Sequence, residues 1–293
     1  MSGSALFMVI ASAFMHAGWN LIVRHQRADA ASHMLQMLGI IAVAGLVPMA
    51  ATEILLGTLG LKVWLCAVTS GLFCAVYCVA LTRGYGSADF TVVYPVVRAL
   101  PVLMVGLGDV ALGRFPTAMG WMGMSLVTLG CFLAPLHSLG AFHPGVYFHR
   151  SGLWMLLAAG GTLGYTLVDK TAAGLVTPGP GSAARYAYLF FAFTWLFFAA
   201  FLRLTRRGNA APARLDWRLA VVGAAMIGGG YWPVLWAYQL VLRASYVVAC
   251  RQFSIVVGVV LAFLIYRETG KFVRITASVL ITLGLVVITL WGK

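Results

Sequence analysis

The sequence has few charged side chains, and acidic ones are the scarcest. Only 9% of its 293 residues are charged and 62% are hydrophobic, whereas a soluble domain has about 25% charged residues. This composition excludes a water-soluble domain and indicates an integral membrane protein. Asp and Glu number 7 against 20 Lys and Arg, so the formal net charge is +13. The basic residues lie at the ends of apolar segments rather than in an aromatic-interleaved patch, so we expect no nucleic-acid partner.

Motifs of enzymes and metal sites are also missing. The sequence has no Ser/His/Asp, HExxH, CxxC or phosphate-loop spacing and no paired intramembrane aspartates. We therefore expect no enzyme, no catalytic residue, no cofactor and no metal. The five cysteines lie in apolar segments without metal-ligand spacing, and we interpret them as packing residues. The N-terminus lacks a basic leader and its apolar run is too long for a signal peptide, which predicts a first spanning helix.

The rest of the chain is a series of apolar segments. A bilayer core needs about 20 apolar residues per helix. Ten segments of that size fit, with short connections between them. The predicted fold class is therefore an all-α integral membrane protein with ten transmembrane helices, at residues 4–23, 34–52, 63–82, 90–112, 118–135, 153–173, 184–202, 219–240, 245–265 and 272–291.

Two short motifs recur along the chain. "GWNLIVR" (residues 18–24) is similar to "GYTLVDK" (164–170), and "SLVTLGCFL" (125–133) is similar to "VLITLGLVVI" (279–288). The offsets of 146 and 154 predict two five-helix repeats within one membrane domain. The first repeat covers residues 1–140 and the second covers 141–293. Because five is odd, the second copy must insert upside down, which is the architecture of secondary transporters with a substrate site near the midplane.

The chain resembles the drug/metabolite transporter superfamily, EamA type. The resemblance is carried by "HAGWNLIVRH" in the first helix, "GSADFTVVYPVVRALPVLMVGLGDVALGRFPT" across the fourth, and residues 243–290. The family's turn with a glutamate is present as "YRET" with Glu268, whereas the first repeat has "LGRF" with Arg114. The resemblance implies a transporter with a central cavity lined mainly by the third, fourth, eighth and ninth helices. The first and sixth helices contribute to it.

One charged residue, Arg98, lies near the middle of the apolar segment predicted as the fourth helix. A central arginine costs roughly 2.5–3.5 kcal/mol on insertion and faces a partner or a cavity. The flanking Pro95 and Pro101 lack an N–H, so each frees a backbone carbonyl one turn earlier. The ninth helix brings Arg251 and Gln252. The 154 offset places Arg98 opposite Gln252, and a slip of one residue places it opposite Arg251.

Two arginines at related positions suit an anion, because guanidinium groups bind carboxylate or phosphate with two hydrogen bonds. The alternative for both is pairing with a structural carboxylate. Only Asp109 is expected well inside a span, and it is about 16 Å from Arg98 along the helix, so it is a poor partner. Arg251 has a further alternative, in which its side chain reaches the membrane interface.

Other polar and aromatic residues complete the candidate substrate site. His16 and Asn20 share one face of the first helix, and His16 is either a packed hydrogen-bond donor or a ligand or proton carrier. We add Tyr94, Trp232 and Gln239, with interface belt as the alternative for the aromatic residues. The stretch "GGGYWP", which includes Gly230 and Pro233, predicts a bend in the eighth helix. The Pro95 and Pro101 region predicts another in the fourth, and both bends would serve gating.

These features predict a secondary transporter that moves a small organic metabolite by alternating access. The expected substrate is an anion or zwitterion, such as an amino acid or a phosphonate-like acid. The expected partners are this substrate, the lipid bilayer, and a coupling proton or an exchanged solute. The alternative function is a flippase or scramblase that uses the same arginines for a lipid head group.

The charge distribution predicts how the chain is oriented in its membrane. We expect a multi-pass protein of the cell membrane, which is the inner membrane in a bacterium. Twelve basic residues lie on one side and six on the side that holds both termini. The positive-inside rule therefore places the loop after the seventh helix in the cytoplasm and both termini outside. The family resemblance implies the opposite, with cytoplasmic termini.

Overall fold

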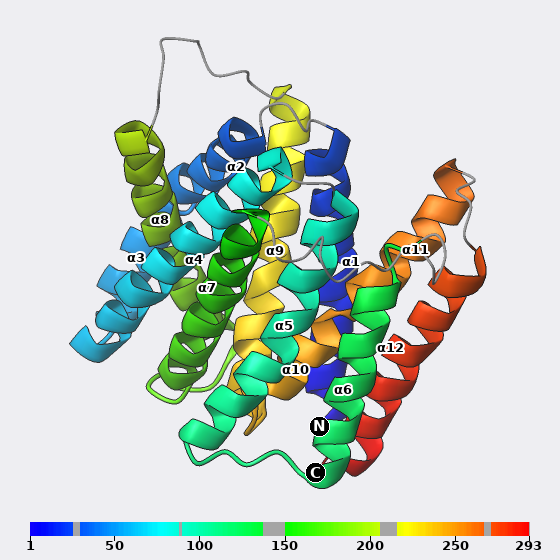
Figure 1. Cartoon of the computed structure of the whole chain (residues 1–293). Helices are drawn as coiled ribbons and strands as arrows, with labels where there is room; N and C mark the ends of the chain where they lie inside the picture. The colour runs from blue at the N-terminus through cyan, green and yellow to red at the C-terminus, as the bar shows by residue number, and fades with distance from the viewer. Residues whose placement is uncertain (26–29, 88–89, 137–149, 206–215, 267–270, 293) are drawn as a thin grey trace.

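The computed structural model describes residues 1–25, 30–87, 90–136, 150–205, 216–266 and 271–292, which form helices and turns without strands (Figure 1). Gly45 alone separates α2 from α3, and Gln252 alone separates α10 from α11, so twelve helices make ten spans. The predicted all-α fold is confirmed. The helices are α1 (Gly3–His25), α2 (Ala30–Ala44), α3 (Leu46–Leu56), α4 (Leu61–Ser87), α5 (Phe90–Ala111), α6 (Ala118–Leu133), α7 (Arg150–Ala173), α8 (Pro180–Thr205), α9 (Trp217–Leu240), α10 (Ala244–Arg251), α11 (Phe253–Tyr266) and α12 (Lys271–Trp291).

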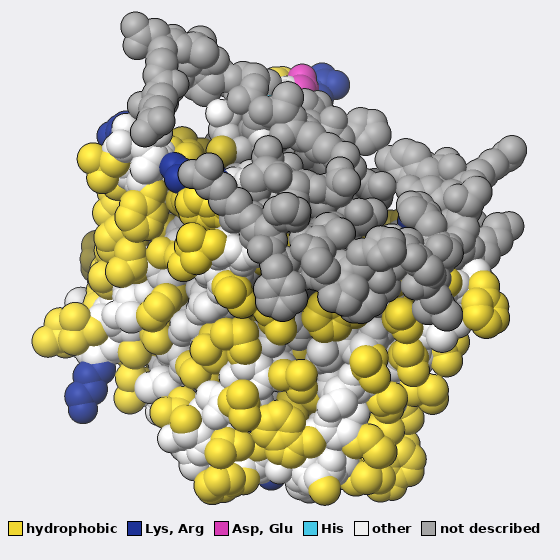
Figure 2. Space-filling model, viewed as in Figure 1, with side chains coloured by type: hydrophobic (Ala, Val, Ile, Leu, Met, Phe, Trp, Pro, Cys, Tyr) yellow, Lys and Arg dark blue, Asp and Glu magenta, His cyan; other side chains and the backbone are white. Residues whose placement is uncertain are grey.

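The outer surface of the bundle is apolar, as a bilayer requires. Figure 2 shows hydrophobic side chains covering most of the visible described surface, with basic side chains near its edges. Many large apolar side chains are exposed, including Phe7, Ile54 and Phe272 at 75%, 82% and 79%. Six segments have the length and composition to cross a membrane, namely Ala30–Leu56, Leu61–Gly84, Pro180–Thr205, Trp217–Leu240, Ala244–Leu261 and Phe272–Trp291. The chain is a multi-pass membrane protein.

The crossing of α6 and α12 has the symmetry of an inverted repeat. A methyl group on Gly130 would lie 2.7 Å from Ala277 O, and one on Gly284 would lie 2.6 Å from Gly123 O. The 154 offset converts the first contact into the second, since it relates Gly130 to Gly284 and Gly123 to Ala277. The order of contacts shows that the two helices are antiparallel. A two-fold axis that exchanges antiparallel helices is perpendicular to them, so it lies in the membrane plane.

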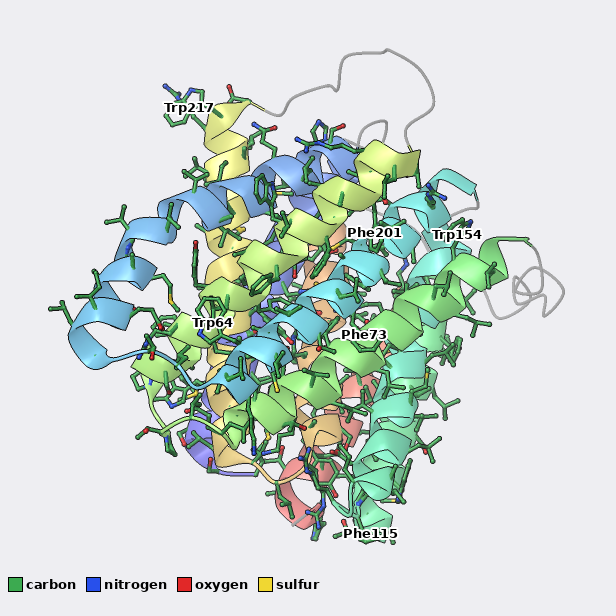
Figure 3. The ribbon with its side chains drawn as sticks, turned by 90° about the vertical axis from the view of Figure 1, so that its left-hand side faces the viewer. Trp64, Phe73, Phe115, Trp154, Phe201 and Trp217 are labelled. Atoms are coloured by element: carbon green, nitrogen blue, oxygen red, sulfur yellow. The ribbon has the colours of Figure 1, made fainter. Side chains whose placement is uncertain are left out.

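A second pair of close helix contacts at glycines shows the same two-fold relation between the repeats. A methyl group on Gly18 in α1 would lie 2.7 Å from Met226 Sδ in α9, and one on Gly164 in α7 would meet the ring of Phe73 in α4. Figure 3 shows Phe73 where α4 passes α7. Gly18 and Gly164 therefore occupy equivalent places, as the motif match predicts. The division between the repeats at residue 140 lies outside the described residues and stays a prediction.

Two predicted helices are interrupted, namely 34–52 at Gly45 and 245–265 at Gln252. Residues 245–265 read as a single span, yet the helix stops at Arg251 and starts again at Phe253. Gln252 N bonds to Ala249 O at 3.0 Å, three residues back, which is a tighter turn than an α-helix. The expectation of a continuous helix was wrong here, because no glycine or proline marks the break in the sequence.

Candidate functional site

An imidazole joins the two arginines that the sequence singles out. Arg98 Nη1 lies 2.5 Å from His16 Nε2, and Arg251 Nη2 lies 3.4 Å from His16 Nδ1. α5 supplies Arg98, α10 supplies Arg251 and α1 supplies His16, so both repeats build this cluster. His16 is 8% exposed and both arginines are partly buried. The predicted convergence of Arg98, Arg251 and His16 is therefore present in the structure.

Hydrogen-bond donors outnumber acceptors around His16. Trp19 Nε1 donates to His16 Nδ1 at 3.1 Å, the nitrogen that also faces Arg251. Guanidinium and indole groups only donate, and a neutral imidazole has one acceptor nitrogen. Arg251 and Trp19 therefore offer more N–H groups to His16 Nδ1 than this nitrogen accepts, and Arg251 Nε is buried without a hydrogen-bond partner among the described residues. A ligand with several acceptor oxygens, such as a carboxylate or phosphonate, complements this donor excess.

The break between α10 and α11 shapes the other side of the cluster. Ser254 Oγ, on the first turn of α11, accepts a hydrogen bond from Arg98 Nη2. Gln252 is 5% exposed and its Nε2 donates to Val248 O at 3.3 Å. Its Oε1 is buried without a hydrogen-bond partner among the described residues. The break thus supplies both a partner for Arg98 and a buried acceptor beside Arg251.

A buried carboxylate lies next to this cluster. Asp169 in α7 is 0% exposed and accepts hydrogen bonds from three hydroxyl groups. These come from Ser70 in α4 to Oδ1, Tyr186 in α8 to Oδ1 at 2.7 Å, and Tyr231 in α9 to Oδ2 at 2.6 Å. The Arg251 guanidinium carbon lies 5.1 Å from the Tyr231 ring centroid. One phenol therefore connects the carboxylate to the arginine cluster.

Asp169 is not among the site residues predicted from the sequence, because it lies only four residues before the predicted end of the sixth span at residue 173 and was interpreted as a helix-end acid. The expectation that only Asp109 lies well inside a span was wrong. α7 ends at Ala173, as predicted, but Asp169 one turn earlier is buried and faces α4, α8 and α9. The motif match itself contained the signal, because "GYTLVDK" places an acid where "GWNLIVR" has Val23. Tyr231 and Ser254 carry no comparable mark in the sequence.

Three of the predicted substrate residues bond elsewhere. Asn20 Nδ2 donates to His16 O at 2.7 Å within α1, so it supports the helix that carries His16. Gln239 Oε1 accepts from Gly179 N at 2.8 Å and its Nε2 donates to Ser182, which ties α9 to the turn before α8. Trp232 is 38% exposed and donates to Pro180 O at 2.8 Å. Gln239 and Trp232 thus lie outside the arginine cluster.

The predicted bends fall within continuous helices. α5 runs unbroken through Pro95 and Pro101, and α9 runs unbroken through Gly230 and Pro233. Pro101 is buried, and Gly230 packs against Met15 of α1. The side chains of Tyr94 and Pro95, and all of Glu268, lie outside the described residues. Their roles in binding and gating stay predictions.

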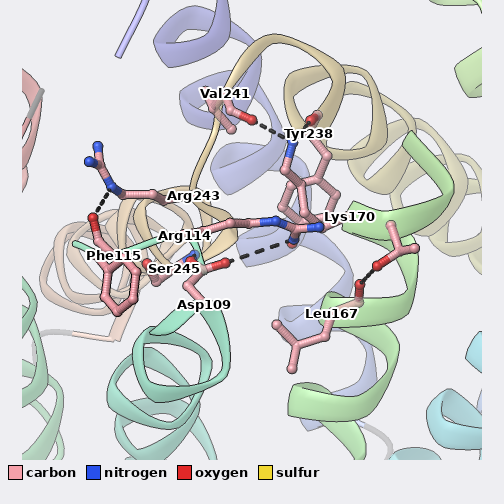
Figure 4. Close-up of polar contacts among 10 residues, drawn as sticks. Asp109, Arg114, Phe115, Leu167, Lys170, Tyr238, Val241, Arg243 and Ser245 are labelled. Carbon is pink, nitrogen blue, oxygen red and sulfur yellow. Dashed lines mark hydrogen bonds and ion pairs between the residues drawn. The ribbon is translucent and has the colours of Figure 1, made fainter. Parts of the chain in front are cut away.

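A second polar network closes the end of the bundle that holds the termini (Figure 4). Asp109 is 0% exposed, lies 4.0 Å from Arg114, and accepts from Ser245 N at 2.8 Å. Lys170 Nζ donates to Tyr238 O at 2.7 Å and to Val241 O at 2.5 Å. Asp109 therefore caps α10 of the other repeat and is not the partner of Arg98. Among the described residues, no three His, Cys, Asp or Glu gather as a metal site.

Comparison with known proteins identifies the first half of the chain. Residues 3–135 match the model of the EamA-like transporter family. This half is therefore similar to the EamA-like transporter family. Together with the apolar helices, this similarity indicates a membrane transporter of the drug/metabolite transporter superfamily, whose EamA members are transporters rather than enzymes.

A solved structure extends the likeness in fold to the whole chain. The structure titled "Crystal structure of protein" covers 100% of this chain and 99% of its own, with a TM-score of 0.72 and 17% identity. That likeness shows the fold alone. No curated protein matches the chain.

Proposed function

We propose that this EamA-like transporter moves a small organic anion or zwitterion by alternating access, with Arg98 and Arg251 as the groups that bind its acidic moiety. The donor excess around His16 is the observation that carries this proposal. Acceptor oxygens of a carboxylate or phosphonate would accept hydrogen bonds from the Arg251 N–H groups that His16 does not satisfy. Charge-assisted hydrogen bonds to guanidinium are among the strong ones. Gln252 Oε1 could accept a hydrogen bond from the ammonium group of a zwitterion.

The position of the cluster supports alternating access. His16 and Arg98 come from the first repeat, and Arg251 and Ser254 come from the second. A substrate held between inverted repeats is released to one side or the other when the repeats rock against each other. A site built from both repeats can therefore open to either side of the membrane when the repeats rock.

A cationic substrate is less well supported, although the structure does contain a membrane-embedded carboxylate. Both oxygens of Asp169 already accept hydrogen bonds from hydroxyl groups. Tyr231 also lies between Asp169 and the cluster at His16. An amine would have to displace these hydroxyls while two guanidinium groups repel it.

A lipid head group is the second candidate, favoured by one feature of the surface. An apolar groove of about 340 Å³ lies between α11 and α12. The first turn of α11 also carries Ser254, which bonds to Arg98. A head group at Arg98 with its chain along this groove would suit a flippase or scramblase. The groove is lined by Val259, Val260, Ile275, Ser278, Val279, Thr282 and Leu283.

The test is a thermal-shift screen of the purified protein against small carboxylates, phosphonates, amino acids, amines and lipids. A ligand that binds only the folded protein raises its stability by RT ln(1 + [L]/Kd). We expect acids or amino acids to raise the unfolding temperature and amines to leave it unchanged. Arg251→Gln should weaken the hit at least about tenfold, roughly 1.4 kcal/mol. Arg218→Gln, an exposed arginine at the start of α9, is the matched control. Stabilisation by amines alone would refute the proposal, and stabilisation by lipids alone would favour the flippase.

A further inference from the structure

The hydroxyl cage of Asp169 suits two protonation states. Cations can only donate to a carboxylate, but a hydroxyl donates to a carboxylate and accepts from a carboxylic acid. All three hydrogen-bonding partners of Asp169 are hydroxyls, from Ser70, Tyr186 and Tyr231. Among the described residues, no Lys or Arg nitrogen lies within ion-pair distance of Asp169. The same side chains can therefore hold Asp169 with or without a proton.

The two repeats differ at the position of this acid. The seam at Gly18 and Gly164 relates Asp169 in the second repeat to Val23 in the first. The first repeat thus builds the equivalent helix with an apolar residue. An ionisable side chain inside a membrane is costly and is retained where it carries protons or ligands. A purely structural role for Asp169 would not account for the valine at the related position of the first repeat.

The described ionisable groups that face Asp169 are thiols, phenols and one guanidinium. Thiols approach from α4, and phenols approach from α7, α8 and α9. Among the described neighbours, the charged group is the guanidinium of Arg251 in α10, which lies over the Tyr231 ring. The facing groups are Cys66, Cys74, Tyr165, Tyr186, Tyr231, Tyr238 and Arg251.

We propose that Asp169 is a proton-binding site coupled to the anion site through Arg251 and Tyr231, so that anion and proton bind together. The coupling to an anion rests on the proposed function. The free Arg251 charge favours the carboxylate form of Asp169. A bound anion cancels that charge, so Asp169 then takes a proton from water to form a carboxylic acid. When the anion leaves, the field of Arg251 returns and the proton is released to water. Linkage makes this effect reciprocal.

The first experiment needs no substrate. Infrared difference spectra of the reconstituted protein at a series of pH values should show the C=O band of a carboxylic acid growing as the pH falls. Asp169→Asn should remove this band, and Asp109→Asn, which changes the other buried acid, should retain it. A spectrum without an Asp169-dependent band, at any pH at which the protein stays folded, overturns the proton site.

The second experiment tests the coupling. Arg251→Gln should move the midpoint of the Asp169 band to higher pH by roughly one unit, the size typical of coupled sites. Arg251→Met also removes the charge, so it replaces Arg251→Gln if that variant does not fold. An unmoved midpoint in the folded variants refutes the link to Arg251.

A third arm separates this proposal from the proposed function. Methylphosphonate and acetate serve as probe anions, and we expect a probe that stabilises the protein to raise the midpoint in the wild type but not in Arg251→Gln. A probe that binds without moving the midpoint refutes joint binding while the anion site stands. If no acid binds, the proposed function fails, and the substrate-free spectra still decide whether Asp169 takes up a proton.

Discussion

Arg98 is held inside the membrane by side chains that only the folded chain brings to it. Its two terminal nitrogens reach His16 on α1 and Ser254 on α11, and neither residue is near Arg98 in the sequence. A buried guanidinium with fixed hydrogen bonds keeps its two-pronged geometry for an incoming oxyanion. Lysine would keep the charge but would lose the planar guanidinium that gives an oxyanion two parallel hydrogen bonds.

We therefore predict graded effects at Arg98. Arg98→Lys should weaken anion binding about tenfold, because it loses one charged hydrogen bond. Arg98→Ala should weaken binding by roughly 2–5 kcal/mol, on the order of 30- to 5,000-fold. Thermal-shift titration with an acid found in the screen measures both effects. Wild-type affinity in Arg98→Ala would show that the anion binds elsewhere, and the lysine variant still gives a result if the alanine variant does not fold.

At the residue scale the sequence predicts the charged members of the site better than their partners. Arg98, Arg251 and His16 stand out because ionisable groups are rare in apolar segments. Ser254 and Tyr231 belong to residue types that are common in such segments, so only their positions in space reveal them. Asp169 was misjudged because a helix end predicted to within about three residues cannot distinguish a terminal acid from a buried one.

At the scale of helices, close crossings at glycine hold the bundle together. At the crossing of α6 and α12, the backbone of Gly123 lies close to Gly284. A side chain on Gly284 would meet this backbone, which cannot move aside as a flexible side chain can. Helix association in a bilayer depends on such close packing, because lipid supplies no hydrophobic driving force between helices. The Thr-Leu-Gly motif recurs in both repeats because each glycine meets the other helix.

Gly284→Ala is predicted to destabilise the protein. The added methyl group would lie 2.6 Å from Gly123 O and 2.7 Å from Val127 Cγ2. Overpacking of this kind costs about 1–3 kcal/mol, so the unfolding temperature in detergent should fall. Gly160→Ala is the matched control, because its methyl group would meet nothing within 4 Å. Alanine should there stabilise α7 by about 0.4–1 kcal/mol. Equal effects of the two substitutions would contradict this account of the seam.

The spans could be predicted from the sequence, but their interruptions could not. Apolar length alone defines ten segments, and all ten appear as helices. Prolines are visible breakers, yet α5 and α9 continue through them, whereas the second repeat breaks at Gln252, where no breaker stands. That break depends on contacts with other helices, such as Ser254 with Arg98, and local sequence contains no trace of them.

At the scale of the molecule, two copies of one unit cross the membrane in opposite directions. The contacts at Gly18, Gly164, Gly130 and Gly284 obey one two-fold relation, so most of the architecture could be predicted from two short motif matches. Figure 1 places both termini at one end of the bundle, as an even number of spans requires. Which side of the membrane that end faces stays a prediction from the basic residues.

We predict that the end of α8 faces the cytoplasm and that the termini face out. Thr205→Cys, at the exposed end of α8, should react with a membrane-impermeant maleimide only after cells are permeabilised. Gly60→Cys, exposed at the termini end, should react in intact cells. Of the five native cysteines, four are buried and Cys66 is partly buried, so their background labelling should be low. The reverse pattern of labelling would support the family topology instead.

The self-complementary seam between α6 and α12 is the kind of interface that joins the subunits of a homodimer. A dimer of one such unit would carry the same residue in both subunits, and so either two acids or none beside its two-fold axis. Joining the copies in one chain removes that restriction. This chain has Asp169 at the motif position where its first repeat has Val23, so a single carboxylate can serve a centre that pairs an arginine from each half.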